Sequence, residues 1–521
     1  MRGDTGMLLL LAVVLLSSIH AGGVGATAAG RLVTDAGQTR QLLSTNVVPE
    51  SFTKTGDYDY GAVLSLSLLF YEAQRSGFLP ANQRVAWRGN SALNDRTPSG
   101  QDLTGGYYDA GDFVKFNLPQ AFAMTMLSWG VLEFREGYEK AGELSHALAT
   151  IKWGTDYLLK CDLGGKAVVA QVGLGQQDHS FWRRPEDIKD SRPVAICDAS
   201  APGSDVAAAM SAALAAAALV FKQADAAYAA RCLKSARNMY SFANSQRSLY
   251  WEKCSKDAQR YYPSHCYMDD LAWAAAWLNW ATGEQQYLTE AAQHYADHRT
   301  KEKDAFEKYK FGLYWDTVSS GAALLLSRKL QDKAYSDQLT NFLDLWTSYK
   351  GNPHVVFSNK GFAWYTKDSG WGSLRHMSNA AFLLLVYAKQ LSGISRDRAV
   401  CFAHGQMRYA LGEAGRSFVV GYGNNPPQRV HHRAASCPNP PAVCDYRYFS
   451  LQSPNPRTVF GALVGGPDPS DIYRDDRTDA QANEVAIDYN SGFTGALAAL
   501  NTASISYDQC VAKGLKRQKL G

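Results

Sequence analysis

Two carboxylates three residues apart mark the stretch of this 521-residue chain that is most suggestive of chemistry. Asp109 and Asp112 lie in residues 104–117, TGGYYDAGDFVKFN, among glycines and tyrosines. The glycines permit a sharp turn or a close approach to a ligand. In a cleft, one carboxylate can raise the pKa of its neighbour or orient a water molecule. Taken alone, the pair also suits a helix cap, a turn or a cation site.

Two later stretches carry complementary groups. Residues 417–433, SFVVGYGNNPPQRVHHR, present His431 and Arg433 after a Gly/Asn/Pro loop. These donors suit sugar hydroxyls or a carboxylate, although a rigid surface turn is the simpler alternative. A metal cluster is disfavoured there, because adjacent histidines point apart and no third ligand is local. Residues 472–495 carry Glu484 near an expected helix start, where a partner of the helix dipole is the simpler interpretation.

Together, the three stretches supply what glycoside hydrolysis requires. One acid protonates the leaving oxygen while a carboxylate activates water on the opposite face of the sugar. Motifs for other common chemistries are missing from the sequence, which has no G-x-S-x-G elbow, H-E-x-x-H, P-loop or G-x-G-x-x-G. The combination therefore favours carboxylate chemistry.

The elements that must position these groups are helical. Residues 205–218 are small and apolar nearly all round, which predicts a helix buried on every side. Trp273, Trp277 and Trp280 recur at helical spacing and are expected to pack in the core. About a dozen helical segments and few strand patterns predict one all-α domain. A toroid of paired helices with a groove built from loops at one end is expected, and a helical solenoid also fits the helix count.

Composition and the N-terminal region bear on localisation. The chain is 46% hydrophobic with a formal net charge of +4, and its basic residues are scattered apart from positions 513–519, so no nucleic-acid footprint is present. Arg2, an apolar run and small residues near position 28 predict a secretory signal peptide over residues 1–28. We expect a secreted, extracellular monomer with no membrane association after signal removal.

The nine cysteines agree with export. They are dispersed without a C-x-x-C motif, which excludes a zinc ribbon or a thioredoxin motif. Cys437 and Cys444 flank a Pro-rich loop and are the easiest disulfide to propose. The odd count leaves at least one thiol free or paired outside the chain.

Long segments of the chain resemble glycoside hydrolase family 9. They are FYEAQRSGFLP at 70–80, VAWRGNSALND at 85–95, DLTGGYYDAGD at 102–112, PGSDVAAA at 202–209, GYGNNPP at 421–427 and NEVAIDYNSGF at 483–493. The resemblance implies an (α/α)6 barrel and a secreted endo-β-1,4-glucanase, a cellulase that inverts anomeric configuration. It assigns residues 45–507 to the catalytic domain and leaves 508–521 as a short, solvated basic tail.

The resemblance also implies residue roles. Asp112 is the general base that deprotonates water, Asp109 helps to hold and tune that water, and Glu484 is the general acid. His431 matches a motif residue near the cleavage point, and Asp475 falls on the third acidic signature position of the family. The residues expected to bind sugar are Arg433, Tyr489, His179, Trp182, Trp371, Arg375 and Phe311, with Trp371 as a stacking platform.

The chain departs from the family pattern at a few positions. Ala480 and Ser264 stand where aromatic residues are usual, and Phe311 stands where many bacterial members have tryptophan. These changes imply weaker binding in one or two subsites without loss of a chemical step.

No cofactor is required by this chemistry, but some family members hold a structural Ca²⁺. The corresponding carboxylates here are Asp269, Asp270 and Asp316, enough for a hard cation with oxygen ligands. A usual serine ligand aligns with His265, which is unsuited to Ca²⁺. Helix-capping acids are the alternative interpretation.

Other functions stay open at this point. The same fold could act on mixed-linkage glucan, xyloglucan or glucomannan, or as an exo-glucosidase, since the sequence does not show whether the groove is open at both ends. A catalytically weak glucan-binding protein is a further alternative. The joint presence of Asp109, Asp112 and Glu484 argues against it.

Overall fold

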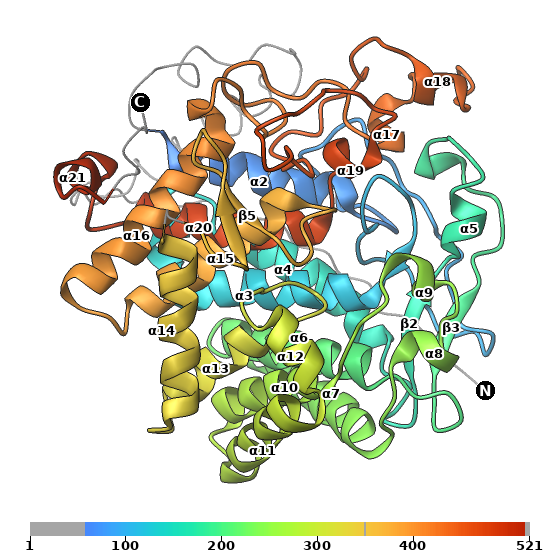
Figure 1. Ribbon diagram of the computed structural model, residues 1–521. Coiled ribbons are helices and arrows are strands. Elements are labelled where there is room, and N and C mark those ends of the chain that lie inside the picture. Colours follow the sequence, from blue (N-terminus) through green and yellow to red (C-terminus); the bar gives the residue numbers. More distant parts are fainter. Residues whose placement is uncertain (1–57, 349–350, 516–521) are drawn as a thin grey trace, which may run out of the picture. The chain divides into compact units, whose positions relative to one another are not determined.

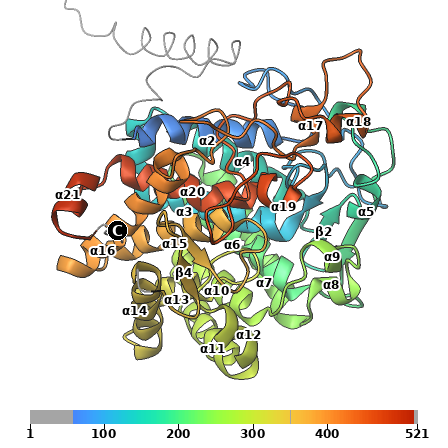
Figure 2. The same cartoon turned by 45° about the horizontal axis from the view of Figure 1, so that its top comes forward.

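The structure is a computed structural model that describes residues 58–348 and 351–515 (Figures 1 and 2). The predicted signal peptide at 1–28, the first part of the predicted domain at 45–57 and the last residues of the predicted tail lie outside the described residues. Within the described residues the all-α prediction is confirmed, since helices form almost the whole frame.

An inner set of helices is buried on nearly every side. Its members in the described chain are α3 (Asn117–Lys140), α6 (Ser204–Phe221), α10 (Met268–Thr282), α13 (Ser319–Ser327), α15 (Ser373–Ala388) and α20 (Ile487–Asn501). Contacts run from α3 through α6 and α10 to α13, and from α15 through α20 back to α3. Trp129, Trp273 and Trp277 meet edge to face among these helices, which confirms the core position predicted for the last two.

An outer helix precedes each inner helix along the chain. The outer helices are α2 (Tyr60–Gln74), α4 (Leu144–Lys160), α7 (Ala226–Ser245), α11 (Gln285–Lys301), α14 (Lys333–Thr347) and α16 (Gly393–Arg408). Each contacts inner helices on either side of it, such as α7 with α6 and α10. This alternation is the predicted toroid of paired helices.

The Ala-rich helix α6 illustrates how sequence sets position in the barrel. Its length and composition would allow it to span a membrane, but 94% of that window is buried within the described residues. Alanine side chains let α3, α7 and α10 approach it closely. The prediction of a helix buried on every side is confirmed.

Short strands and short helices lie at the ends of the barrel. Strands β1 (Lys115–Phe116), β2 (Val168–Val172) and β3 (Val194–Cys197) form an antiparallel sheet in that order, and β4 (Val355–Phe357) pairs with β5 (Ala363–Tyr365). The short helices are α5 (Gly175–Asp178), α8 (Tyr250–Lys253), α9 (Ala258–Tyr261), α12 (Lys303–Tyr309), α17 (Arg433–Ser436), α18 (Arg447–Ser450), α19 (Ala480–Asn483) and α21 (Tyr507–Ala512). Figure 1 shows α17, α18 and α19 together at one end, beside α5.

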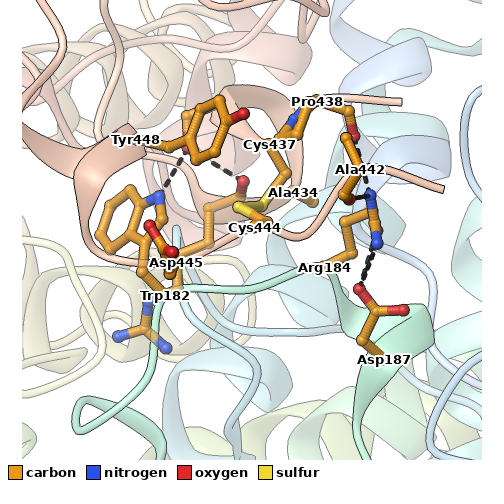
Figure 3. The surroundings of a disulfide bond; sticks show 12 residues. Trp182, Arg184, Asp187, Ala434, Cys437, Pro438, Ala442, Cys444, Asp445 and Tyr448 are labelled. Carbon is orange, nitrogen blue, oxygen red and sulfur yellow. Dashed lines mark hydrogen bonds and ion pairs between the residues drawn. A yellow bond between two sulfur atoms is a disulfide. The ribbon is translucent and has the colours of Figure 1, made fainter. Parts of the chain in front are cut away.

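Three disulfides join described cysteines: Cys197–Cys254, Cys401–Cys510 and Cys437–Cys444. The predicted pair Cys437–Cys444 is therefore confirmed (Figure 3). Beside it, the Arg184 guanidinium donates to the carbonyl oxygens of Pro438 and Ala442 at 3.0 and 2.8 Å. This disulfide fixes the loop that follows the His431–Arg433 stretch.

The region predicted as a solvated tail differs from that prediction over residues 508–515. Helix α21 buries Tyr507 and Cys510, and the Cys401–Cys510 disulfide ties it to α16. Lys513 forms an ion pair with Asp397. The prediction of a solvated tail rested on the high lysine and arginine content of the last residues and did not take account of Cys510, which anchors this segment.

Candidate active site

The segment with the two aspartates is a tight loop between α2 and β1. The backbone N–H of Asp109 donates to the Val114 carbonyl at 3.0 Å and closes the loop. Gln74, at the end of α2, donates to the Ala110 carbonyl at 2.6 Å. The Ile487 N–H, at the start of α20, donates to the Asp109 carbonyl at 2.9 Å. Two buried helices thus hold the loop in place.

Gly111 is the point at which all three predicted stretches meet. Its N–H donates to Glu484 Oε1 at 3.3 Å, and its carbonyl accepts from the Arg433 N–H at 3.0 Å. A Cβ atom on Gly111 would lie 2.2 Å from the His431 carbonyl oxygen and 3.2 Å from the His432 Cα. These are backbone atoms, so no side-chain rotation relieves the overlap. Glycine is required here by close approach.

Replacing Gly111 with alanine is therefore expected to lower kcat on the order of 10²-fold, because small displacements of reacting groups have effects of that size. The Asp112 loop must move away from His431 to admit the methyl group. Initial rates on a soluble cellulosic substrate measure the effect, and near-ultraviolet circular dichroism checks that the core stays folded. Gly61→Ala is the matched control, since Gly61 lies in helix α2 and a Cβ there meets only side-chain atoms, at 3.3 Å. Equal activity of the two variants would contradict the assignment of this junction.

Asp112 is a buried carboxylate with cationic neighbours. Its Oδ2 lies 3.3 Å from His179 Nε2. Burial raises the pKa of Asp112, but the His179 hydrogen bond and the charges of His179 and Arg433 more than offset this and hold the pKa below its usual value. The same contact raises the pKa of His179, against the opposing effect of burial. Asp112 is therefore ionised at neutral pH, with His179 as its partner.

The surroundings of Asp109 shift its pKa in the opposite direction from that of Asp112. Burial, and then the charges of Asp112 and Asp488, raise its pKa well above the usual range. Its Oδ2 accepts from the Tyr262 hydroxyl, and its Oδ1 has no hydrogen-bond partner among the described residues. Asp109 therefore holds a proton more tightly than Asp112 does. Tyr262 lies 153 residues away in sequence, and no local motif could have identified it.

Glu484 follows α19 and is fixed through its backbone. Its N–H donates to the Ala480 carbonyl at 2.9 Å, and its carbonyl accepts from the Gly465 N–H at 2.8 Å. Burial, and then the negative charge of Asp112, raise the pKa of Glu484 to about 8. The carboxyl group is therefore neutral and able to donate a proton at neutral pH.

His431 is held as a neutral imidazole. Its Nδ1 lies 2.8 Å from the Arg477 carbonyl, which only accepts, so Nδ1 carries the proton and Nε2 is an acceptor. Burial and the Arg433 charge lower the pKa of His431 to about 4, against the effect of the Arg477 carbonyl. Arg477 is itself buried and donates to the carbonyls of Tyr448 and Leu451 at 2.7 Å.

The adjacent His432 points into the protein instead of the site. Its Nδ1 accepts from the Ala435 N–H at 3.0 Å, and its Nε2 donates to Gln74 Oε1 at 2.7 Å. Because Gln74 also binds the Ala110 carbonyl, it connects the histidine loop to the aspartate loop. Gln74 is a positioning residue that the sequence did not single out.

Arg433 and Trp182 lie beneath the site and support it. Arg433 is buried, and its Nη1 donates to the Asp178 carbonyl at 3.0 Å and to the Asp178 carboxylate. Trp182 is 3% exposed, donates from Nε1 to the Ser436 hydroxyl at 2.9 Å, and packs edge to face on His431 with ring centroids 5.3 Å apart. Their buried position suits orientation of His431 more than stacking on a sugar.

Asp475 also acts on the histidine loop through its backbone. Its carboxylate accepts from the N–H groups of Gln428 and Arg429 at 3.0 and 2.9 Å. Those residues immediately precede the His431 segment. Asp475 is thus joined to the site by the loop, and no contact with the other predicted acids is recorded among the described residues.

Arg375 and Tyr489 form a buried layer beside the acids. Arg375 donates to Asp488 at 2.9 Å and to Asp368 at 3.2 Å, and its guanidinium lies 5.4 Å from the Tyr489 ring centroid. Tyr489 packs against Ala110, which lies between Asp109 and Gly111 in the sequence. Asp488 also contributes to the raised pKa of Asp109, which makes this layer part of the electrostatics of the site.

The two remaining aromatic predictions differ in exposure. Trp371 is 49% exposed and is free to stack on a ligand. Phe311 is 5% exposed, contacts His354 edge to face, and accepts at its carbonyl from Trp346 Nε1. Phe311 therefore offers little ring face to a sugar in this structure.

The three carboxylates predicted to bind calcium do not form a ready set of oxygen ligands. Asp316 accepts through both carboxylate oxygens from His265, at 2.7 Å from the backbone N–H and 2.5 Å from Nδ1. Asp269 accepts from Cys266 Sγ and from the Val318 N–H at 3.2 and 3.0 Å. As arranged, these residues do not fit calcium, because His265 already engages both Asp316 oxygens that the ion would need as ligands. Calcium binding stays an untested prediction.

Comparisons with known proteins agree with this geometry. Residues 60–497 match the family described as glycosyl hydrolase family 9. Endoglucanase 4 of Bacillus sp. (strain KSM-522) is 42% identical over 449 residues, which cover 84% of this chain and 68% of that protein.

Solved structures show the same likeness in three dimensions. The endoglucanase of the termite Nasutitermes takasagoensis superposes with a TM-score of 0.80 and 46% identity, covering 86% of this chain and 99% of that one. The cellulase Cel9M of C. cellulolyticum, in complex with cellobiose, gives a TM-score of 0.78 and 34% identity over 86% of this chain and 99% of that one.

Proposed function

The chain belongs to glycosyl hydrolase family 9, and from this premise we propose that it is a secreted endo-β-1,4-glucanase in which Glu484 is the general acid and Asp112 the general base. One observation carries the residue assignment. Both carboxyl groups are brought to Gly111, yet their surroundings shift their pKa values in opposite directions. A neutral acid beside an ionised base is the pair that an inverting hydrolysis needs.

The reaction is a single displacement. Glu484 donates its proton to the glycosidic oxygen as the bond from that oxygen to the anomeric carbon breaks. Asp112 takes a proton from a water molecule, whose oxygen attacks the anomeric carbon from the opposite face, so the configuration inverts. Asp109 Oδ1, which has no other partner among the described residues, is available to bind this water. Asp112 then releases its proton to solvent and Glu484 regains one, which restores both groups for the next cycle.

The neutral His431 has a role that follows from its tautomer. Its Nδ1–H is committed to the Arg477 carbonyl, so Nε2 is left to accept a hydrogen bond from a sugar hydroxyl. Trp182 packs against the imidazole, burial and the Arg433 charge lower its pKa, and Asp475 fixes the backbone that leads to it. His431 therefore binds and orients the sugar without exchanging a proton with it.

The ligand is a β-1,4-linked glucan chain. The cellobiose complex of Cel9M supports this for a relative, and the exposed ring of Trp371 provides a surface for one pyranose. The three disulfides fit an oxidising compartment, in agreement with secretion. We take residues 45–507 as the catalytic domain and a monomer as the working state.

The pH dependence of kcat/KM follows from the two shifted carboxyl groups. Activity should fall on the alkaline side near pH 8, as Glu484 loses the proton that it must donate. It should fall on the acid side only below the ordinary aspartate range, as Asp112 is protonated and loses its basicity. Because the carboxyl groups interact, both limbs belong to the cluster as a whole. An alkaline limb near 4.5, the ordinary value for glutamate, would contradict the assignment of Glu484.

Product analysis on defined cello-oligosaccharides tests the activity itself. Proton NMR of fresh reaction mixtures should show the α-anomer first, before mutarotation. On carboxymethyl cellulose, viscosity should fall much faster than reducing ends accumulate, because internal bonds are cut. A β-anomer as first product would exclude the single displacement, and release of cellobiose alone without loss of viscosity would exclude endo action.

A further inference from the structure

Four side chains gather between α10 and α11, and the hydrolysis described above uses none of them. Cys266 and Asp269 lie at the start of α10, whereas His298 and Glu302 lie at the end of α11. Each offers one metal-ligating atom, and these atoms all lie within 4.8 Å of one another. Two helices that pack together thus bring four ligands of different chemistry to one place.

The spacing along each element explains the arrangement. Cys266 comes two residues before α10 and Asp269 lies in its first turn, whereas His298 lies in the last turn of α11 and Glu302 is its C-cap, four residues on. Cys266 Sγ lies 3.2 Å from Asp269 Oδ1, and His298 Nδ1 lies 2.8 Å from Glu302 Oε2. Tetrahedral zinc, with bonds of about 2.0–2.3 Å, separates its ligand atoms by roughly 3.3–3.8 Å. The Cys266–Asp269 pair is therefore close to ligand spacing, whereas the His298 and Glu302 atoms must move apart by about half an ångström.

Charge and hydrogen bonding are incomplete at this place. Asp269 and its neighbour Asp270 are buried, and within the described residues neither has an ion pair with lysine or arginine, while His298 forms an ion pair with Glu302. His298 is 1% exposed, and its Nε2 has no hydrogen-bond partner in the described part of the chain. Burial and the nearby carboxylates raise the pKa of the Cys266 thiol well above its usual range. A cation would compensate this buried negative charge.

We propose that Cys266, Asp269, His298 and Glu302 bind one divalent transition-metal ion of the zinc class. Thiolate and imidazole ligands select such ions, whereas calcium takes six to eight oxygen ligands. The site differs from the calcium set predicted from the sequence, with which it shares only Asp269. Binding replaces the Cys266 S–H bond with a sulfur–metal bond and releases the thiol proton to solvent, so metal uptake is weaker at acid pH.

Cobalt(II) is the probe that tests this site on the intact, disulfide-bonded protein. After removal of metal by a chelator and dialysis, one equivalent of Co²⁺ should produce a sulfur-to-cobalt charge-transfer band, and one equivalent of Zn²⁺ should abolish it. Cys266→Ala should remove the band. His298→Gln should weaken Co²⁺ binding by about tenfold or more. Cys232→Ala is the matched control, because Cys232 is also a free, buried thiol but lies on α7 outside the group.

Several results would overturn the proposal. They are no uptake of Co²⁺ or Zn²⁺ at large molar excess, uptake without a sulfur band, and a band that persists in Cys266→Ala. Should Cys266→Ala fail to fold, the wild-type spectrum alone decides. Zinc bound instead at Asp112, Asp178 and His179, the other close group of ligands among the described residues, would inhibit hydrolysis and give no sulfur band. Loss of hydrolytic activity and loss of the band are separate outcomes.

Discussion

Replacing Glu484 with glutamine is expected to lower kcat on carboxymethyl cellulose by about 10²–10⁴-fold, the usual contribution of a general acid. Glutamine keeps the size of the side chain and its contact with the Gly111 N–H, but it has no proton to give to the leaving oxygen. KM should change little, because the lost interaction belongs to the transition state. Steady-state kinetics by reducing-sugar assay measures both parameters.

The control for this variant is a substrate that needs no acid. An aryl β-cellobioside with a strongly acidic phenol releases its leaving group without protonation, so Glu484→Gln should lose much less activity on it. Equal losses on both substrates would mean that Glu484 has another role. Stability is a second check. Because the pKa of Glu484 is raised to about 8 in the folded state, the folded protein loses stability relative to the unfolded chain as the pH rises from 4.5 to about 8. Glu484→Gln should therefore melt no lower than wild type at pH 7.

Replacing Asp112 with asparagine is expected to lower kcat by a similar factor, about 10²–10⁴-fold, on both kinds of substrate. The water must be deprotonated whatever the leaving group, so an activated aryl glycoside should not rescue this variant. That contrast separates the base from the acid. The measurement is the ratio of kcat values on the polysaccharide and on the aryl glycoside for each variant.

Asp109→Asn is the matched comparison for Asp112. Because its surroundings raise the pKa of Asp109 and disfavour its negative charge, asparagine is a close substitute, and it can still accept from Tyr262. Its loss of activity should be smaller than that of Asp112→Asn. Near-full activity of Asp112→Asn beside an inactive Asp109→Asn would show that the two roles are reversed. Asp112→Asn also loses stability that wild type has above pH 3.8, since the folded-state pKa of Asp112 is lowered.

The sequence was informative where chemistry or composition is local. The acids, the histidine loop, the Cys437–Cys444 disulfide and the buried Ala-rich helix all carry their signal within about twenty residues. The resemblance to the family implied an (α/α)6 barrel, and the helices of the structure agree with it. Helix α11 was not predicted, because its exposed face is polar and its few buried residues do not form a clear apolar pattern.

The contacts in the site that the sequence did not predict join residues far apart in the chain, which only the folded barrel brings together. Tyr262 reaches Asp109 across 153 residues, and Gln74 reaches His432 across 358. Burial also changed the interpretation of several predicted residues, since Arg433 and Trp182 match binding positions but lie under the site. A sequence pattern identifies residue types, whereas exposure and protonation depend on neighbours that are distant along the chain.

The Cys401–Cys510 disulfide divides the site between two parts of the chain. The bridge closes a loop of 109 residues that contains His431, Asp475 and Glu484, while Asp112 lies outside it. In the unfolded, oxidised chain, such a loop has lost conformational entropy equivalent to about 4.7 kcal/mol on a chain-entropy basis. The acid and the sugar-binding histidine therefore share one covalently closed loop, whereas the base, Asp109 and its partner Tyr262 come from the chain that precedes it.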